Sequence, residues 1–246
     1  MTRATRAPRA TRAVAALLAA TAALAATGCR DAPDDKPKTV VETRFLERLS
    51  TAIRDVNAAR QRLADDGNAL GAAAQALDDV DEVAVDGDRT KARERRPAAA
   101  KAVQAAAPVA RRLNEHVRAY ERAVAALDAA DAPGLTPEQL TALSDAVLAG
   151  RTEVTELKRF AGAVASSWPR YEKLDNDQKL WVARAYNGWY RTQQESAGAY
   201  VVLTERQKLA TARRTFAAAD TRRVTAAREA AATFETVRGV LAPLFE

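Results

Sequence analysis

Residues able to carry covalent or metal chemistry are scarce in this chain of 246 residues. The sequence holds one histidine, His116, and one cysteine, Cys29. Zinc sites of the His-Glu-x-x-His type need two histidines, and a Cys–His pair needs a free thiol beside a histidine. His116 lies next to an apolar stripe, which is more typical of an edge-of-core or surface residue. The sequence therefore predicts no catalytic residue, no metal site and no cofactor, and it favours a protein that is not an enzyme.

Carboxylates are abundant, but their spacing selects no site. Eight acids and no base lie between residues 65 and 88. With Gly87 at the sixth position of a calcium loop, the twelfth position falls on Arg93, so the EF-hand spacing is not met. A hydrolase that uses two carboxylates remains an alternative, although so charged a chain does not single out a pair.

Aromatic residues gather in one segment of the chain. The candidate binding surface consists of three tryptophans and three tyrosines within a short stretch: Trp168, Tyr171, Trp181, Tyr186, Trp189 and Tyr190. Such residues either pack in a core or act as anchors for a protein, peptide or glycan. A small-ligand or glycan-binding module is therefore a second alternative, and it would need a pocket that contains at least two of these side chains.

The first 28 residues have the features of an export signal. Arg3, Arg6, Arg9 and Arg12 precede an uncharged stretch of Ala, Leu and Val that covers residues 13–26. A basic start, a short apolar stretch and small residues after it are typical of a secretory signal peptide. A permanent membrane span is the weaker interpretation, because it needs about 20 apolar residues.

The end of this segment, Leu24-Ala25-Ala26-Thr27-Gly28-Cys29, resembles the lipobox of bacterial lipoproteins. Gly28 and Cys29 match that motif, whereas Ala26 stands where leucine is the commonest residue. The resemblance implies cleavage after residue 28, a diacylglyceryl group with palmitate-like chains on Cys29, and attachment to the extracytoplasmic side of the cell membrane. It covers only the first 29 residues, and the excess of Ala and Arg is typical of actinobacteria. Ordinary signal-peptidase cleavage, which would release a soluble secreted protein, is the alternative.

Charge makes nucleic acid an unsuitable partner. The formal net charge is +6. Removal of the four signal-peptide arginines leaves 34 basic against 32 acidic residues, which is close to neutral. A basic block at residues 89–112 follows the acidic run. The two blocks either neutralise each other at the surface or the basic one contacts anionic lipid or a cell-wall polymer. We expect the membrane to be a partner through the lipid anchor, with an envelope protein or cell-wall polymer as a further candidate.

The elements expected to carry these residues are helices. Residues 29–38, with Pro33 and Pro37, indicate a flexible tether, and residues 39–246 indicate a single helical domain. Apolar residues recur at three-four spacing in four stretches, 46–63, 70–84, 103–127 and 140–164. Residues 178–244 have a helical composition, and the same spacing returns there from Val224 to Phe234. This pattern predicts an all-α fold, an elongated antiparallel bundle of four to six helices with coiled-coil-like packing.

Several helix boundaries can be proposed from local signals. Asp65-Asp66-Gly67-Asn68 predicts a helix end, and residues 86–88 predict a turn. Residues 166–169, the last of which is Pro169, predict the end of a further helix. Pro97 suits a helix first turn, and Pro108 predicts a bend. Thr136-Pro137-Glu138-Gln139 predicts a helix start with a capping box, and Asp175-Asn176-Asp177 offers another N-cap. Residues 178–244 form either one helix or two with a break near residues 205–221.

Overall fold

The computed structural model describes residues 40–85, 89–128, 134–191 and 197–245. Within these ranges it describes the side chains of residues 43–80, 90–128, 134–172 and 207–245. The chain divides into two units, Met1–Val40 and Val41–Glu246, and the second unit contains the helical fold. Cys29, the tether and the predicted turn at residues 86–88 lie outside the described residues.

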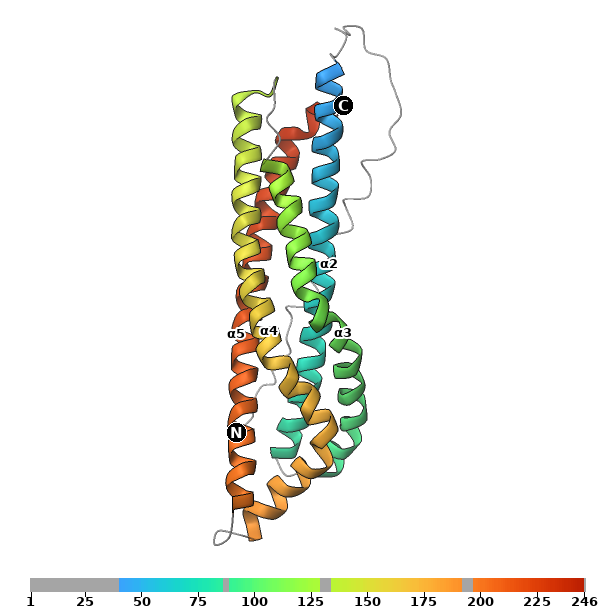
Figure 1. Ribbon diagram of the computed structural model, residues 1–246, viewed down its shortest axis with the longest axis vertical. Helices are drawn as coiled ribbons and strands as arrows, with labels where there is room; N and C mark the ends of the chain where they lie inside the picture. Colours follow the sequence, from blue (N-terminus) through green and yellow to red (C-terminus); the bar gives the residue numbers. More distant parts are fainter. Residues whose placement is uncertain (1–39, 86–88, 129–133, 192–196, 246) are drawn as a thin grey trace, which may run out of the picture. The chain divides into compact units, whose positions relative to one another are not determined.

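The second unit is built from four long helices. They are α2 (Val40–Val85), α3 (Arg89–Asp128), α4 (Pro137–Arg191) and α5 (Ala197–Leu241), followed by a short 3-10 turn, η2 (Ala242–Leu244) (Figure 1). Apart from residues 134–136 and Phe245, every described residue is helical, and none of them forms a strand. The all-α prediction is confirmed, and the number of helices falls at the lower end of the predicted range.

Contacts between the helices give an antiparallel arrangement. Glu121 of α3 pairs with Lys158 of α4, and Asp128, further along α3, pairs with Arg151, earlier on α4. Likewise, Arg60 of α2 contacts the carbonyl of Ala227 of α5, whereas Asp78 contacts Arg213. In each of these helix pairs, the residue numbers of the contacts rise along one helix and fall along the other. The two helices of each pair therefore run in opposite directions. The packing agrees with a helix bundle.

The core is a continuous apolar interior between the four helices. Leu49, Val103, Tyr120, Phe160 and Val164 are among its fully buried residues. Small residues let the helices approach closely: a Cβ at Gly150 would lie 2.8 Å from a methyl group of Val124. Of the residues predicted to face inward, Leu140 is an exception, because its side chain is 46 % exposed.

Four predicted helix boundaries are wrong. α2 continues through residues 65–68, and α3 begins at Arg89, before the first turn predicted at Pro97. α4 continues through Pro169 and through the predicted N-cap at residues 175–177. A proline inside a helix removes one hydrogen bond and costs about 3 kcal/mol. At Pro169 the burial of Trp168 and Tyr171 on either side favours continuation. Figure 1 shows α3 bending along its course, as expected for a helix with interior prolines.

The last helix also differs from the prediction. α5 is unbroken across residues 205–221. Its buried face includes Phe216, Ala219, Arg223, Ala226 and Ala230, which is one residue out of step with the predicted stripe from Val224 to Phe234. The prediction missed this face because a charged residue, Arg223, occupies one of its inward positions.

The predicted helix start at Thr136 is confirmed. The Gln139 backbone N–H donates to Thr136 Oγ1 at 3.2 Å, and the Thr136 N–H donates to Gln139 Oε1 at 3.0 Å. This reciprocal pair is a capping box. None of the helices, within the residues the structure describes, is long and apolar enough to cross a membrane.

Candidate functional site: a buried polar network

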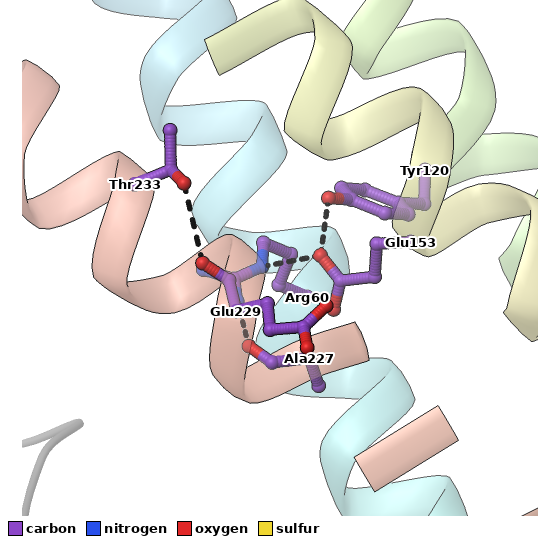
Figure 2. A network of polar contacts seen from close by, with 6 residues as sticks. All are labelled: Arg60, Tyr120, Glu153, Ala227, Glu229 and Thr233. Atoms are coloured by element: carbon purple, nitrogen blue, oxygen red, sulfur yellow. Dashed lines mark hydrogen bonds and ion pairs between the residues drawn. The ribbon is translucent and has the colours of Figure 1, made fainter. Parts of the chain in front are cut away.

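A polar network lies inside the bundle and joins all four helices. Arg60 comes from α2, Tyr120 from α3, Glu153 from α4 and Ala227 from α5 (Figure 2). Glu153 is 5 % exposed and Tyr120 is fully buried. Buried charged and hydroxyl groups of this kind need partners, because a polar group without one costs several kcal/mol.

Glu153 accepts two hydrogen bonds on one oxygen. Arg60 Nε donates to Glu153 Oε2 at 3.0 Å, and the Tyr120 hydroxyl donates to the same oxygen at 2.6 Å. Arg60 Nη2 also donates to the Ala227 carbonyl at 3.0 Å. The guanidinium carbon lies 4.9 Å from the centre of the Phe234 ring, within the range of a cation–π contact. Arg60 is thus held by contacts with α4 and α5 at once.

Burial controls the protonation of this network. It raises the pKa of the Glu153 carboxyl above its usual value, and Arg60 and the Tyr120 hydroxyl act in the opposite direction. Burial, followed by the neighbouring Glu153 charge, raises the pKa of Tyr120 far above the ordinary value for tyrosine. Tyr120 therefore stays protonated and remains a hydrogen-bond donor at every physiological pH.

Arg223 forms a second buried charged group close to α2. Arg223 is 7 % exposed, and its Nε donates to Asp220 Oδ1 at 2.8 Å. Its guanidinium lies 5.1 Å from the centre of the Phe160 ring. A Cβ added at Gly67 would fall in the space that the Arg223 guanidinium occupies, so a larger residue there would require that group to shift. Gly67 therefore serves close packing inside a helix and not the helix end that its type predicted.

His116 belongs to the polar interior as well. Its Nδ1 lies 2.6 Å from Asp66 Oδ2, and the two side chains are 23 % and 10 % exposed. The pair joins α2 to α3. The edge-of-core position expected for His116 agrees with this partial burial.

Two of the six candidate surface aromatics are core residues. Trp168 is 3 % exposed and Tyr171 is 1 % exposed. Their rings meet edge to face at 5.5 Å, and Tyr171 packs against Phe216 of α5 at 6.1 Å. Burial raises the pKa of Tyr171 to about 12. For these two residues the core alternative holds, because a side chain this buried cannot offer an exposed anchor.

The other four candidates remain predictions. Trp181, Tyr186, Trp189 and Tyr190 belong to the last part of α4, and their side chains lie outside the described residues. Two surface grooves lie among the described residues, and neither is lined by Trp168 or Tyr171. The pocket required by the ligand-binding alternative therefore gains no support from these two aromatics.

The larger groove contains two carboxylates. It has a volume of about 720 Å³ and lies between the first turns of α4, with Glu138 and Asp145, and the last turns of α5, with Thr233 and Val240. Seven residues of helix separate the two acids by about 10 Å along one axis. Carboxylate pairs in glycosidases face each other across a bond at about 5–9.5 Å. Two acids on one wall of an open groove do not favour the hydrolase alternative.

Charged residues from the two sequence blocks also pair with other helices. Asp78 of the acidic run lies 2.6 Å from Arg213 of α5, and Arg111 of the basic block lies 3.5 Å from Glu172 of α4. No group of three or more His, Cys, Asp or Glu side chains suited to a metal ion occurs among the described residues.

The sequence pattern contained a sign of the network. Arg60 is the one charged interruption of an otherwise apolar stripe between Leu46 and Leu63. A charge at an inward position requires a buried partner. Glu153 could not be chosen as that partner from spacing alone, because the choice depends on which helix faces α2.

Comparison of the chain with protein-family models, with curated proteins and with solved structures finds no match.

Proposed function

We propose that this chain is a lipoprotein anchored on the extracytoplasmic side of a bacterial membrane, and that its helical bundle acts as a non-enzymatic scaffold or binding partner at the cell envelope. The resemblance of residues 24–29 to a lipobox supports the anchor. Two acyl chains on Cys29 would give stable attachment, since each buried CH₂ contributes about 0.8 kcal/mol.

The arrangement of the polar network carries the scaffold part of the proposal. Arg60 contacts α4 and α5, and Glu153 contacts α2 and α3. The strongest donors and acceptors of this interior therefore bind one another. Groups arranged in this way fix the relative positions of the helices, as a rigid scaffold needs, and their hydrogen bonds are already made within the protein.

Metabolic labelling tests the anchor. The full chain and its Cys29→Ser variant are expressed in a bacterial host supplied with labelled palmitate. We expect the unmodified sequence to carry the label and to sediment with membranes, and the variant to carry none. An unlabelled wild-type chain that is released into the medium would support the secreted alternative instead.

Crosslinking in membranes tests the scaffold role. Trp189→Ala is the suitable variant for the aromatic segment, whereas Trp168→Ala is not. Truncation of a buried tryptophan costs about 3–5 kcal/mol and would confuse loss of folding with loss of binding. We expect a specific envelope partner whose capture depends on Cys29. Equal capture by the Cys29→Ser variant would contradict a role at the membrane.

A further inference from the structure

Two exposed apolar side chains mark one end of the bundle. Among the described residues, the large apolar side chains that are exposed are Leu140 at 46 %, Leu148 at 65 % and Phe245 at 41 %. Leu140 lies in the first turn of α4, and Phe245 directly follows η2. Leu148 lies about 12 Å further along α4. Single exposed apolar residues are ordinary on a protein surface, so the position of Leu140 and Phe245 relative to the proposed anchor decides whether this end has a role.

The same end carries the beginning of α2. Ile53 of α2 packs against a small apolar cluster that contains Ala142 of α4 and Leu241 of α5. The residues before Ile53 therefore lead toward the start of α4 and the end of α5. Figure 1 shows the beginning of α2, the beginning of α4 and the C-terminal end of α5 at one end of the bundle.

Chain connectivity brings this end near the anchor, provided that Cys29 is lipidated as in the proposed function, on which this inference rests. Val41 follows Cys29 by 12 residues, which reach at most about 40 Å when fully extended. The other end of α2 lies a further 46 residues of helix away, which is about 69 Å. Of the two ends of the bundle, the one with Leu140 and Phe245 is therefore nearer to the anchor along the chain, within a tether length of about 40 Å.

We propose that this end is a membrane-contact surface, in which Leu140 and Phe245 enter the headgroup region of the phospholipid bilayer. An aromatic and an aliphatic side chain bury apolar area there without displacing any core contact. The anchor keeps the surface at high local concentration near lipid, so a small contact area is sufficient. The contact orients the bundle with its opposite end away from the membrane.

Apolar contact, and not charge, is the basis of this surface. The exposed Arg44 and Arg48 at the start of α2 suit anionic headgroups, but the exposed Glu47 and Glu138 lie at the same end. Mixed charges give little net attraction to an anionic surface. Added salt is therefore expected to leave the contact in place.

Fluorescent labelling tests the surface in the lipidated full chain. Leu140→Cys, Leu148→Cys, Phe245→Cys and Thr90→Cys are made singly, labelled with an environment-sensitive maleimide and placed in phosphatidylethanolamine–phosphatidylglycerol vesicles. A lipidated Cys29 has its sulfur in a thioether and does not react, so the introduced thiol alone takes the label. Thr90 is the matched control, because it is exposed in the first turn of α3 at the opposite end.

We expect blue-shifted emission at residues 140 and 245, with loss of most of the intensity when spin-labelled lipids are added. We expect weaker quenching at Leu148 and none at Thr90. Equal quenching at Leu148 and Leu140 would mean that the bundle lies flat and would overturn the proposal. A blue shift at Leu140 that lipid quenchers do not affect would indicate a protein neighbour, such as a second copy, and would overturn it too.

Mass analysis of the N-terminal peptide from the same sample separates the two proposals. An acylated Cys29 without quenching at residues 140 and 245 overturns the contact surface and leaves the lipoprotein proposal intact. A chain without acyl groups overturns both.

Discussion

At the scale of single residues, Glu153 depends on donors from two other helices. Arg60 and Tyr120 both donate to its Oε2, and burial opposes its ionisation. Because burial raises the pKa of Glu153 above its value in the unfolded chain, its contribution to stability is complete at acidic pH. That contribution decreases as pH rises through the folded-state pKa.

This balance predicts a pH-dependent effect of Tyr120→Phe. The variant removes a hydrogen bond that favours the carboxylate, so it should raise the pKa of Glu153 further. We expect the free energy of unfolding to fall by about 1–3 kcal/mol, with a larger loss at an alkaline pH of about 8 than at an acidic pH of about 5. Urea unfolding across this pH range measures the difference.

Tyr171→Phe is the matched control, because Tyr171 is equally buried and has no bond to Glu153. We expect its effect to be the same at both pH values. A loss in Tyr120→Phe that does not change with pH would contradict the assignment of Glu153 as the acceptor whose ionisation is coupled to Tyr120.

Two arginines show where sequence reasoning stops at this scale. Arg60 was visible as an interruption of an apolar stripe, but its partner was not. Arg223 carries a charge and so breaks the apolar pattern of α5, although it lies on the buried face of that helix and is 7 % exposed. Its position depends on an ion pair with Asp220 and on the space above Gly67, and the second of these depends on how distant helices pack.

At the scale of helices, α2 illustrates how packing overrides a local signal. Asp65-Asp66-Gly67-Asn68 has the composition of a helix end, yet α2 is unbroken over its 46 residues. Leu63 and Leu70 remain buried on either side, and Asp66 pairs with His116. The burial of the two leucines and the pairing of Asp66 together outweigh the roughly 1 kcal/mol that glycine costs in a helix.

The contrast between Gly67 and Gly71 gives a direct test. Gly67→Ala places a methyl group in the space of the Arg223 guanidinium, so we expect a net loss of stability of about 1–3 kcal/mol despite the better helix propensity of alanine. At Gly71 a Cβ would meet nothing within 4 Å, so Gly71→Ala should raise stability by up to about 1 kcal/mol. Thermal unfolding of both variants checks this. Equal stabilisation by the two would contradict the claim that the Arg223 guanidinium is held closely against Gly67.

The capping box of α4 is a feature that local sequence predicts well. Thr136 and Gln139 each donate a backbone N–H to the side-chain oxygen of the other, and no residue of another helix takes part in these two hydrogen bonds. Thr136→Ala should lower the free energy of unfolding by about 1 kcal/mol. Thr141→Ala is the control, since the Thr141 hydroxyl donates to the Pro137 carbonyl one turn earlier and its loss should change stability by less than about 0.5 kcal/mol. Chemical denaturation distinguishes the two, and equal effects would contradict a capping role for Thr136.

At the scale of the whole molecule, periodicity was sufficient for the fold class. Three-four spacing of apolar residues predicted an all-helical bundle, and the four helices confirm it. The predicted breaks at residues 65–68 and 166–169 were wrong. Gly and Pro were taken as helix ends, although the burial of the residues beside them stabilises a continuous helix. Of the candidate surface, Trp168 and Tyr171 proved to be core residues, and composition alone could not separate the two roles.

The bundle and the anchor depend on different parts of the chain. The internal network joins the helices of the bundle, whereas the proposed place at the membrane depends on Cys29 and on the resemblance of residues 24–29 to a lipobox. The contact surface at Leu140 and Phe245 depends on that anchor in turn.

The most direct test of a membrane-anchored bundle is intact-mass and peptide mass spectrometry of the protein extracted from membranes of its bacterial host. Lipidation predicts a chain that begins at Cys29 and carries a thioether-linked diacylglyceryl group. A chain that still begins at Met1, or one that begins at another residue and has no acyl chains, would contradict it.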